Sequence, residues 1–296
     1  MIDLDELNQM SITIRPITNA DTEACGRIIY EAFKRFHDHH RFPPDFQTVE
    51  EAVQLAGIFV QHPAIFGVVA EIDGRVVGSN FLGERNTIRG VGPITVAPDV
   101  QERGIGRRLM EVVIERGRDA AGIRLCQDAF NTGSLSLYAS LGFEAKELLA
   151  LIEGTPKTKG LADFEVRPLR REDLAECADL CKRVHGFDRV DELRDALEFF
   201  SPIVALRGAQ IAAYASAPFY WKLNHGVAET EEDMRALIIG AAAVSTQPLA
   251  MLVPVRQANF FRWCLCEGLR VIKPMTLMTM GMYHEPNGCY FPSVEY

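Results

Sequence analysis

The stretch from Val91 to Leu109, VGPITVAPDVQERGIGRRL, most constrains what this chain can fold into. It predicts a strand, a turn and a glycine loop that leads directly into a helix. The strand carries Gly90, Gly92 and Pro93, and such residues weaken a β-ladder or remove a backbone donor. We therefore expect a bulged or splayed strand whose last backbone N–H and C=O groups lack ladder partners and can pair with an extended, amide-bearing ligand. These groups belong to Ile94, Thr95 and Val96.

The glycine loop QERGIG, residues 101–106, becomes the first turn of an amphipathic helix, because apolar residues recur at helical spacing after it. The first N–H groups of a helix have no internal partners and lie at the positive end of its dipole, so they bind anions. Gly104 and Gly106 let a phosphate approach the backbone without a Cβ in the way. Arg103, Arg107 and Arg108 add positive charge, which is unfavourable at this end of a helix unless an anion compensates it. The loop is typical of a diphosphate cradle.

The spacing Q-x-x-G-x-G in this loop resembles motif A of the GNAT superfamily of N-acetyltransferases. A second block, NTGSLSLYASLGF from Asn131 to Phe143, is similar to the superfamily pattern N-x-x-A/S-x-x-L-Y-x-x-x-G-F at every spacing. Two motifs in this order, separated by a helix and a strand, are a stronger signal than one glycine motif. The alternative is a generic α/β phosphate loop, for instance of a dinucleotide-binding domain. Such a domain should carry G-x-G-x-x-G near its first βα turn, and the sequence has none.

The resemblance implies acetyl-CoA as the cofactor. In family terms, N–H groups of the loop hold the pyrophosphate, while the splayed strand pairs with the pantetheine arm and the second motif contacts that arm from the other strand edge. The expected cofactor-binding residues are Ile94, Thr95, Val96, Gln101, Arg103, Gly104, Ile105, Gly106, Arg107, Asn131 and Ser134. No metal is expected.

Tyr138 lies where the superfamily commonly places a tyrosine that protonates the departing thiolate. A phenol has an ordinary pKa near 10, close to that of an alkyl thiol, so it can donate a hydrogen bond as negative charge builds on sulfur. The alternative is a tyrosine that only packs and hydrogen-bonds backbone. Tyr138 is the expected catalytic residue.

The order of predicted elements, β-α-α-β-β-β-α-β-α-β-β, resembles the superfamily over residues 11–153. It places a second helix at 48–60, a hairpin around Asp73-Gly74, a strand at 123–127, a helix at 134–141 and the closing strands at 143–152. The resemblance implies a mixed-sheet α/β (α+β) fold of two tandem GNAT-like domains. Each is expected to be a twisted, mostly antiparallel sheet flanked by helices, with a splayed central strand.

A second copy follows the linker-like segment EGTPKTKGLA. Arg167 and Asp173 follow Arg15 and Asp21 by 152 positions, and Gly268 follows Gly142 by 126 positions. We predict an N-terminal catalytic domain over residues 1–153, a linker over 154–162 and a degenerate C-terminal domain over 163–296. The second copy is degenerate because it lacks Q-x-x-G-x-G and has Cys264 in place of the motif tyrosine. It is expected to support the first half, shape its acceptor pocket, or pair with it across an extended sheet.

Composition sets the class of protein. The 296 residues suffice for two ordinary domains, and a net charge of -9 argues against a nucleic-acid scaffold. No apolar run reaches the roughly 20 residues needed to span a bilayer, and the acidic N-terminus lacks the regions of a signal peptide. We expect a cytoplasmic protein without a membrane or nucleic-acid partner, with a homodimer possible. The seven cysteines show no zinc spacing and read as core thiols.

The group that takes the proton of an acceptor amine is open. Glu84 and Asp128 are candidates by position, beside Glu31 and His39. The three histidines of that segment, His37, His39 and His40, are either metal ligands or, as we favour, part of a solvated helix end. The resemblance implies instead that this region forms part of the acceptor-substrate wall. Cys126 has no catalytic-cysteine signature around it.

Two features distinguish the second copy. Acidic residues could hold a cationic acceptor, although acids also favour the start of a helix. These residues are Glu229, Glu231, Glu232 and Asp233. The aromatic tail from Gly288 to Tyr296 either packs across a groove or docks on its own core.

Together these features favour an acyltransferase that moves an acetyl group from acetyl-CoA to the primary amine of a small molecule, with the second domain shaping the acceptor site. One alternative is a non-catalytic sensor or partner-binding module that binds CoA or acyl-CoA. Another is a peptide N-terminal acetyltransferase.

Overall fold

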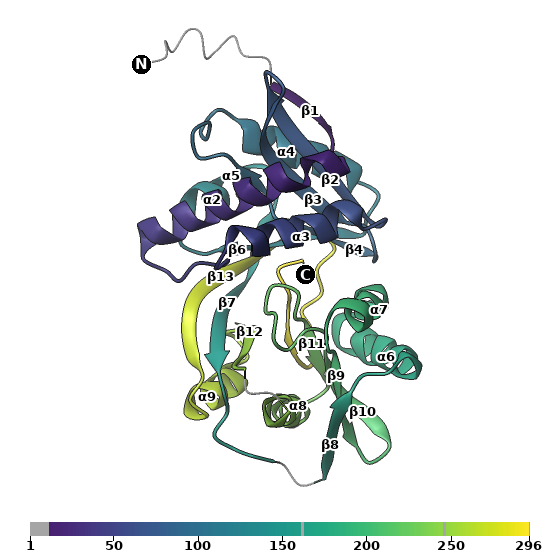
Figure 1. Ribbon diagram of the computed structural model, residues 1–296. Coiled ribbons are helices and arrows are strands. Elements are labelled where there is room, and N and C mark those ends of the chain that lie inside the picture. The colour runs from purple at the N-terminus through teal and green to yellow at the C-terminus, as the bar shows by residue number, and fades with distance from the viewer. Residues whose placement is uncertain (1–11, 161–162, 245–246, 296) are drawn as a thin grey trace. The chain divides into compact units, whose positions relative to one another are not determined.

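The computed structural model describes residues 12–160, 163–244 and 247–295 (Figure 1). The predicted positions of Ser11, Leu161, Ala162 and Tyr296 lie outside these residues. The chain divides into two compact units, residues 1–84 with 91–120 and residues 85–90 with 121–296. The predicted domain bounds follow the sequence repeat and stay a prediction.

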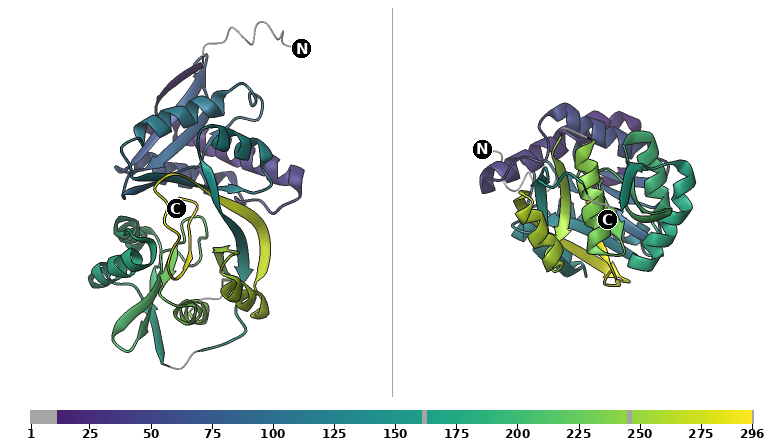
Figure 2. Two further views of the ribbon diagram at one scale, coloured as in Figure 1. Left: turned by 180° about the vertical axis from the view of Figure 1, so that it is seen from behind. Right: turned by 90° about the horizontal axis from the view of Figure 1, so that it is seen from below.

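The first unit is an antiparallel sheet with helices on both faces. Its elements are β1 (Ile12–Pro16), α2 (Thr22–His40), α3 (Val49–Gln61), β2 (Ile65–Ile72), β3 (Arg75–Gly83), β5 (Thr95–Val96) and α4 (Ile105–Arg116). β2 pairs with β1 on one side and with β3 on the other, and the left-handed residues Asp73 and Gly74 close the predicted hairpin. Helices α2 and α3 cover one face of this sheet and α4 covers the other (Figures 1 and 2). The predicted second helix is α3, which Thr48 caps by accepting a hydrogen bond from the Glu51 N–H.

The predicted interruption of the central strand is confirmed. The strand breaks into β4 (Ile88–Val91) and β5, with a cis Gly92–Pro93 peptide bond between them. β4 pairs in parallel with β6 (Gly122–Asp128), whereas β5 pairs antiparallel with β3. The chain therefore changes strand partner at the glycine-proline segment.

The backbone of Thr95 differs from the prediction that residues 94–96 lack ladder partners. The Ala97 N–H donates to the Val77 carbonyl at 2.8 Å, and Thr95 lies opposite Ser79 in the same ladder. Because hydrogen-bonded and non-hydrogen-bonded pairs alternate in an antiparallel ladder, Thr95 is bonded to β3 while Val96 points its backbone groups to the opposite edge. The prediction for Thr95 is therefore wrong, and only one edge of this short strand is open.

The second unit contains two sheets. Its elements, besides β4 and β6, are α5 (Thr132–Ser140), β7 (Glu144–Gly154), β8 (Phe164–Pro168), α6 (Leu174–His185), α7 (Val190–Phe199), β9 (Ile203–Arg207), β10 (Gln210–Ala215), β11 (Gly226–Ala228), α8 (Glu231–Ala243), β12 (Leu249–Pro254), α9 (Ala258–Cys266), β13 (Arg270–Gly281) and β14 (Cys289–Phe291). One sheet runs β4-β6-β13-β7-β12 and the other β14-β11-β10-β9-β8. Helices α6 and α7 cover one face of the second sheet, and α8 covers the other (Figure 1).

The prediction that residues 143–152 supply more than one closing strand is wrong. They form the single strand β7, and β13 from the second copy lies between β6 and β7, antiparallel to both (Figure 1). β12 then pairs with the far edge of β7. Since β6 and β12 hold equivalent places in the two copies, as do β7 and β13, the copies exchange their closing strands. This exchange confirms the prediction that the second copy pairs with the first across an extended sheet.

The internal repeat is confirmed at the level of single side chains. The Arg15 guanidinium donates two hydrogen bonds to the Asp21 carboxylate, both at 2.8 Å, and Arg167 does the same to Asp173 at 2.7 and 2.9 Å. Both carboxylates begin the first helix of their copy. Helices α5 and α9 also begin and end 126 positions apart.

The aromatic tail docks on the core of the second unit. β14 pairs with β11, and the side-chain amide of Gln257 makes two hydrogen bonds with the backbone of Tyr290, at 2.6 and 3.1 Å. All seven cysteines are free thiols, and six of them are buried or partly buried. Across the part of the chain that the structure describes, we find no helix with the length and apolarity required to traverse a membrane.

Candidate functional site

The glycine loop presents backbone N–H groups at the start of α4. Glu102 and Gly104 both have left-handed backbone conformations, with φ of 67° and 74°, and Gly104 is the N-cap. A turn with alternating backbone handedness gathers successive N–H groups into a concavity that binds anions. No side chain caps this helix, and the N–H groups of Gly104, Ile105 and Gly106 donate to no other described residue. The loop therefore has the backbone geometry of the predicted cradle.

The charge around the loop is positive. The first turn of α4 carries no acidic residue, whereas Arg107 and Arg108 lie in it and are exposed. Arg107 lies 3.9 Å from Glu111, one turn further along the helix. Cations at this end of a helix oppose its dipole, so the arrangement is stabilised when an anion is bound between them.

Gln101 ties the loop to the splayed strand. Its Nε2 donates a hydrogen bond to the Val96 carbonyl at 3.0 Å, on the edge of β5 that faces away from β3. Val96 thus keeps its N–H for a ligand, while its carbonyl is already used by the protein. Gln101 acts through its side chain to position the loop.

Asn131 caps the helix of the second motif. Its Oδ1 accepts a hydrogen bond from the Ser134 N–H at 3.0 Å. The cap leaves the Nδ2 group of Asn131 as the donor for a ligand carbonyl. Asn131 and Ser134 thus form the N-terminal cap of α5 together.

Tyr138 is buried, with 5% of its surface exposed, and its ring lies edge-on to Phe143. Burial raises the pKa of the phenol to about 12, against the opposing effect of a hydrogen bond with the Ser134 side chain. The phenol is therefore protonated at neutral pH, as a proton donor must be. Tyr138, Asn131 and Ser134 lie together in the second unit, and the glycine loop with β5 lies in the first.

Comparison with known proteins identifies the N-terminal part. Residues 27–143 match the acetyltransferase (GNAT) family. An uncharacterized N-acetyltransferase of Methanocaldococcus jannaschii is 26% identical over 148 residues, which cover 46% of this chain and 62% of that protein. The family match covers 117 of the 296 residues and contains both sequence motifs. The chain spans less than two thirds of the length of the curated relatives it matches.

The fold likeness extends over nearly the whole chain. A putative acetyltransferase from Pyrococcus horikoshii has a TM-score of 0.71 at 17% identity, with 94% of each chain covered. A tandem GNAT protein from the clavulanic acid biosynthesis pathway has a TM-score of 0.57 at 14% identity, covering 91% of this chain and 98% of that one. The chain therefore has the fold of two tandem GNAT-like domains.

The candidate proton acceptors of the GNAT segment differ in their surroundings. Both carboxylate oxygens of Glu84 accept hydrogen bonds from Arg116, at 3.0 and 2.9 Å. This ion pair disfavours Glu84 as the proton acceptor. Glu31 and His39 are exposed on α2. Asp128 is buried, and its Oδ1 lies 2.7 Å from the Lys273 Nζ. Burial raises the pKa of the Cys126 thiol to about 12, which disfavours the thiolate form that a cysteine nucleophile requires.

The favoured interpretation of the histidine segment is wrong for His37. This side chain is fully buried, with Nδ1 2.9 Å from the Phe33 carbonyl and Nε2 3.7 Å from the Asp45 carboxylate. His39 and His40 are exposed, as a solvated helix end requires. Helical spacing places His37 on the buried face of α2, eight residues after Ile29, but its partner Asp45 comes from the segment after α2 and is not signalled by that spacing.

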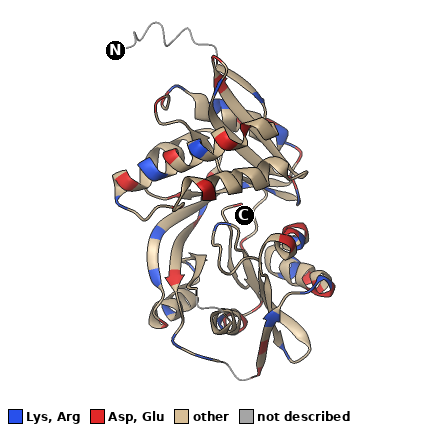
Figure 3. Ribbon diagram, viewed as in Figure 1, with Lys and Arg blue, Asp and Glu red and all other residues tan. Residues whose placement is uncertain are grey.

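The second copy has no equivalent of the glycine cradle. Its corresponding helix, α8, begins with a capping box in which Thr230 and Asp233 satisfy each other's backbone N–H groups. The acids near this end pair with basic neighbours: Glu229 with Arg183, Glu231 with Arg235, and Glu232 with Arg207. Figure 3 colours the acidic residues red and the basic residues blue along the ribbon. These contacts favour the helix-start interpretation of the acidic cluster. They also disfavour a phosphate at α8.

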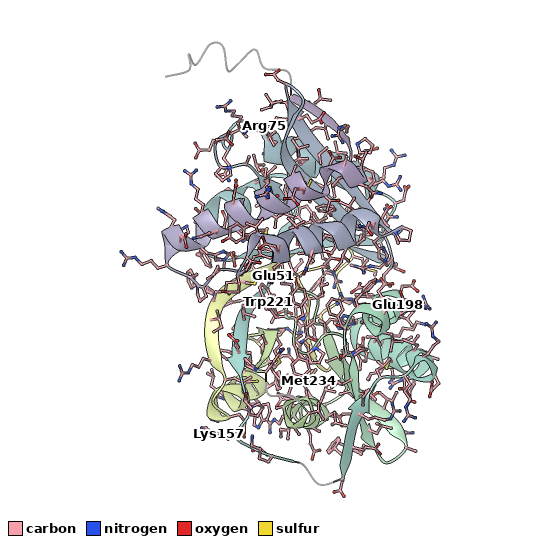
Figure 4. All side chains as sticks on the ribbon, in the orientation of Figure 1. Glu51, Arg75, Lys157, Glu198, Trp221 and Met234 are labelled. Atoms are coloured by element: carbon pink, nitrogen blue, oxygen red, sulfur yellow. The ribbon has the colours of Figure 1, made fainter. Side chains whose placement is uncertain are left out.

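Two site residues had no signal in the sequence. Lys273 comes from the exchanged strand β13, and Trp221 comes from the loop between β10 and β11. The Lys273 ammonium lies 5.2 Å from the centre of the Trp221 ring, which is labelled in Figure 4. Neither residue belongs to a motif, and only the strand order shows that Lys273 comes to lie beside Asp128.

Proposed function

We propose that this protein transfers an acetyl group from acetyl-CoA to the primary amine of a small molecule, and that its N-terminal half performs the chemistry. The observation that carries this proposal is the glycine loop at α4, where three consecutive N–H groups, Gly104 to Gly106, are open beside arginine side chains. The match of residues 27–143 to the GNAT family supports the same activity. The cofactor is acetyl-CoA, and we expect the protein to act in the cytoplasm.

The pyrophosphate of the cofactor would be held by the N–H groups of residues 101–107 and by the charge of Arg103 and Arg107. Ile94 and Val96 would receive the pantetheine amides along the open edge of β5, since Thr95 is already bonded to β3. In this arrangement the positive charge of the loop would bind the pyrophosphate, and pairing with the strand edge would position the thioester.

Asn131 and Ser134 would contact the pantetheine arm from the start of α5. Tyr138 follows Ser134 by one helical turn, and its protonated phenol would give a hydrogen bond, and then a proton, to the leaving thiolate. Stabilising the charge that develops on sulfur is worth most in a buried site, where water does not compete.

Isothermal titration calorimetry with acetyl-CoA tests the proposal. We expect heat of binding for the native chain and none for Gly104→Glu, which places a carboxylate in the cradle at a left-handed position. Asn259→Glu, which adds a carboxylate to the exposed start of α9, is the matched control and should bind as the native chain does. Absence of heat with the native chain would sink the proposal.

Turnover separates catalysis from the alternative of a CoA sensor. Release of CoA thiol in the presence of primary amines supports the enzyme, whereas binding without turnover of amines or of peptide N-termini supports the sensor. Acetylation of peptides alone would replace the small-molecule acceptor by a peptide N-terminus. The oligomeric state, monomer or homodimer, can be read from light scattering of the same samples.

A further inference from the structure

The exchanged strand β13 carries a charged side chain of the second copy to the catalytic half. β13 pairs with β6 so that Met275 lies opposite Asp128 and Leu277 lies opposite Cys126. Lys273 lies two residues before Met275, on the same face of the strand at the carboxyl end of β6. The second copy has lost its own cofactor cradle, but through this strand it still reaches the first copy's motif segment.

Lys273 and Asp128 form a buried ion pair. The Lys273 Nζ lies 2.7 Å from the Asp128 Oδ1, and their side chains are 1% and 6% exposed. The ring of Trp221, also from the second copy, lies 5.2 Å from the same ammonium and limits its access to water. Burying two charges is costly, and replacing such a pair by apolar residues is often neutral or stabilising. Stability alone therefore gives a weak reason for this pair.

Asp128 ends β6 and lies four residues before the first residue of α5, the helix that carries the proposed proton donor. Its carbonyl accepts a hydrogen bond from the Asn131 N–H at 2.9 Å, and the next residue, Ala129, donates its N–H to the Pro274 carbonyl at 3.1 Å. The backbone around the ion pair is thus fixed to both α5 and β13. Among the four candidate proton acceptors named from the sequence, Asp128 is the buried one that the second copy positions.

We propose that Lys273 is a positioning residue for the acceptor, holding Asp128 where its carboxylate receives the proton of the attacking amine. This inference rests on the proposed acetyl transfer and names a proton acceptor and a substrate form for it. The acceptor is a primary amine bound uncharged, because the positive charge of Lys273 disfavours an ammonium ion beside it. The Lys222 Nζ lies 5.2 Å from the centre of the same Trp221 ring, and its positive charge also disfavours an ammonium ion there.

The step balances without another reactant. The amine nitrogen forms a bond to the thioester carbonyl carbon, and its proton passes to the Asp128 carboxylate. The C–S bond then breaks, and the thiolate takes the phenolic proton of Tyr138. The proton on Asp128 leaves to solvent, and Tyr138 regains one from solvent, so that amine and acetyl-CoA yield amide and CoA thiol.

The pH dependence of kcat tests the role of Lys273. Thiol release would be followed at saturating acetyl-CoA with benzylamine and n-butylamine as acceptors. Removing the charge in Lys273→Met raises the pKa values of both Asp128 and the bound amine, so the acid limb of kcat should move to higher pH by about 1 to 3 units. Lys273→Arg keeps the charge and should leave the limb in place. The control Lys182→Met removes an exposed lysine that lies 3.3 Å from Asp188 and should also leave it in place.

A double-mutant cycle tests whether Lys273 acts through Asp128. Asp128→Asn should lower kcat about 10²- to 10⁴-fold, the usual contribution of general base catalysis. Adding Lys273→Met to Asp128→Asn should cause no further loss, and the neutral double variant also guards against misfolding from an unpaired buried charge. Independent, multiplicative losses would overturn the inference, as would an unmoved acid limb in folded Lys273→Met.

The possible outcomes distinguish a failure of the proposed acetyl transfer from a failure of the proposed role of Lys273. Turnover with an unmoved limb overturns the role of Lys273 and leaves the acetyl transfer standing. Binding of acetyl-CoA without turnover of either amine overturns both. Binding of acetyl-CoA should be equal in all variants, because neither residue belongs to the proposed cradle.

Discussion

The carboxyl group of Glu295 should make the stability of the second unit depend on pH. Its Oε2 accepts a hydrogen bond from the Arg85 Nη2 at 2.7 Å, and its side chain is 10% exposed. Burial, together with repulsion from Glu192, raises the pKa of this carboxyl from 4.5 to about 7, against the attraction of Arg85 and Arg189. Asp195 shares Arg85 at 3.1 Å, so the arginine charge is divided between two acids.

The sign and size follow from linkage. The folded protein holds this proton up to about pH 7, while the unfolded chain releases it near pH 4.5, so the stability is fully present below pH 4.5 and is lost as pH rises to 7. The two pKa values differ by about 2.5, and at 1.36 kcal/mol per unit the loss is about 3 kcal/mol. Glu295→Gln keeps the shape of the protonated group and should not show this loss.

Urea unfolding followed by tryptophan fluorescence measures this pH-dependent loss in the free energy of unfolding. Both tryptophans, Trp221 and Trp263, belong to the second unit, so the signal reports on the part that contains Glu295. Between pH 5 and pH 8, Glu295→Gln should lose about 2 to 3 kcal/mol less free energy of unfolding than the native chain, because part of the loss has already occurred at pH 5. Glu285→Gln, at a 70% exposed carboxylate of the same region, is the control and should behave as the native chain. Equal pH dependence in Glu295→Gln and the native chain would refute the reasoning.

Three further predictions follow from the fold and the site. Arg15→Met and Arg167→Met each break the equivalent bidentate contact of their own copy, so each should lower the free energy of unfolding by about 1 to 3 kcal/mol in urea titrations. A change below about 0.5 kcal/mol in both variants would contradict the stabilising role of the repeated pair. Tyr138→Phe should lower kcat about 10²-fold or more at unchanged affinity for acetyl-CoA, as measured by thiol release and calorimetry, and an unchanged kcat would remove Tyr138 from the chemistry. Residues 1–153 expressed alone should fail to give cooperative unfolding, because β13 is missing between β6 and β7, and a cooperative transition of the fragment would contradict the obligatory strand exchange.

The conformation of the glycine loop follows from local chemistry, while its role as a cofactor cradle stays a prediction. Gly104, which adopts a left-handed backbone, and the arginines placed against the helix dipole lie within a few residues of one another, so the sequence contains the cause of the local geometry. The Arg15–Asp21 and Arg167–Asp173 contacts are also local, since the partners lie six positions apart in each pair. This equal spacing predicts the internal repeat from the sequence.

Long-range pairing made the rest unpredictable. The apolar pattern of residues 143–152 is compatible with one strand or two, and nothing local selects β13 as the neighbour of β7. His37 continues the buried face of α2, but only the path of the following segment brings Asp45 to it. The glycines and the proline before Thr95 predicted a strand without ladder partners. Thr95 nevertheless pairs with Ser79 in β3, a strand whose place is set by the hairpin with β2. Each of these depends on strand order and chain path.

The most direct test of the account is whether the amides of the glycine loop receive the cofactor's phosphates. A ¹⁵N-glycine-labelled sample resolves the N–H groups of Gly104 and Gly106 among the 23 glycines of the chain, and single Gly→Ala variants assign them. The account predicts that both resonances shift on addition of CoA and stay in place with pantetheine, which lacks the diphosphate. Saturable binding of CoA that leaves both resonances unmoved would contradict it.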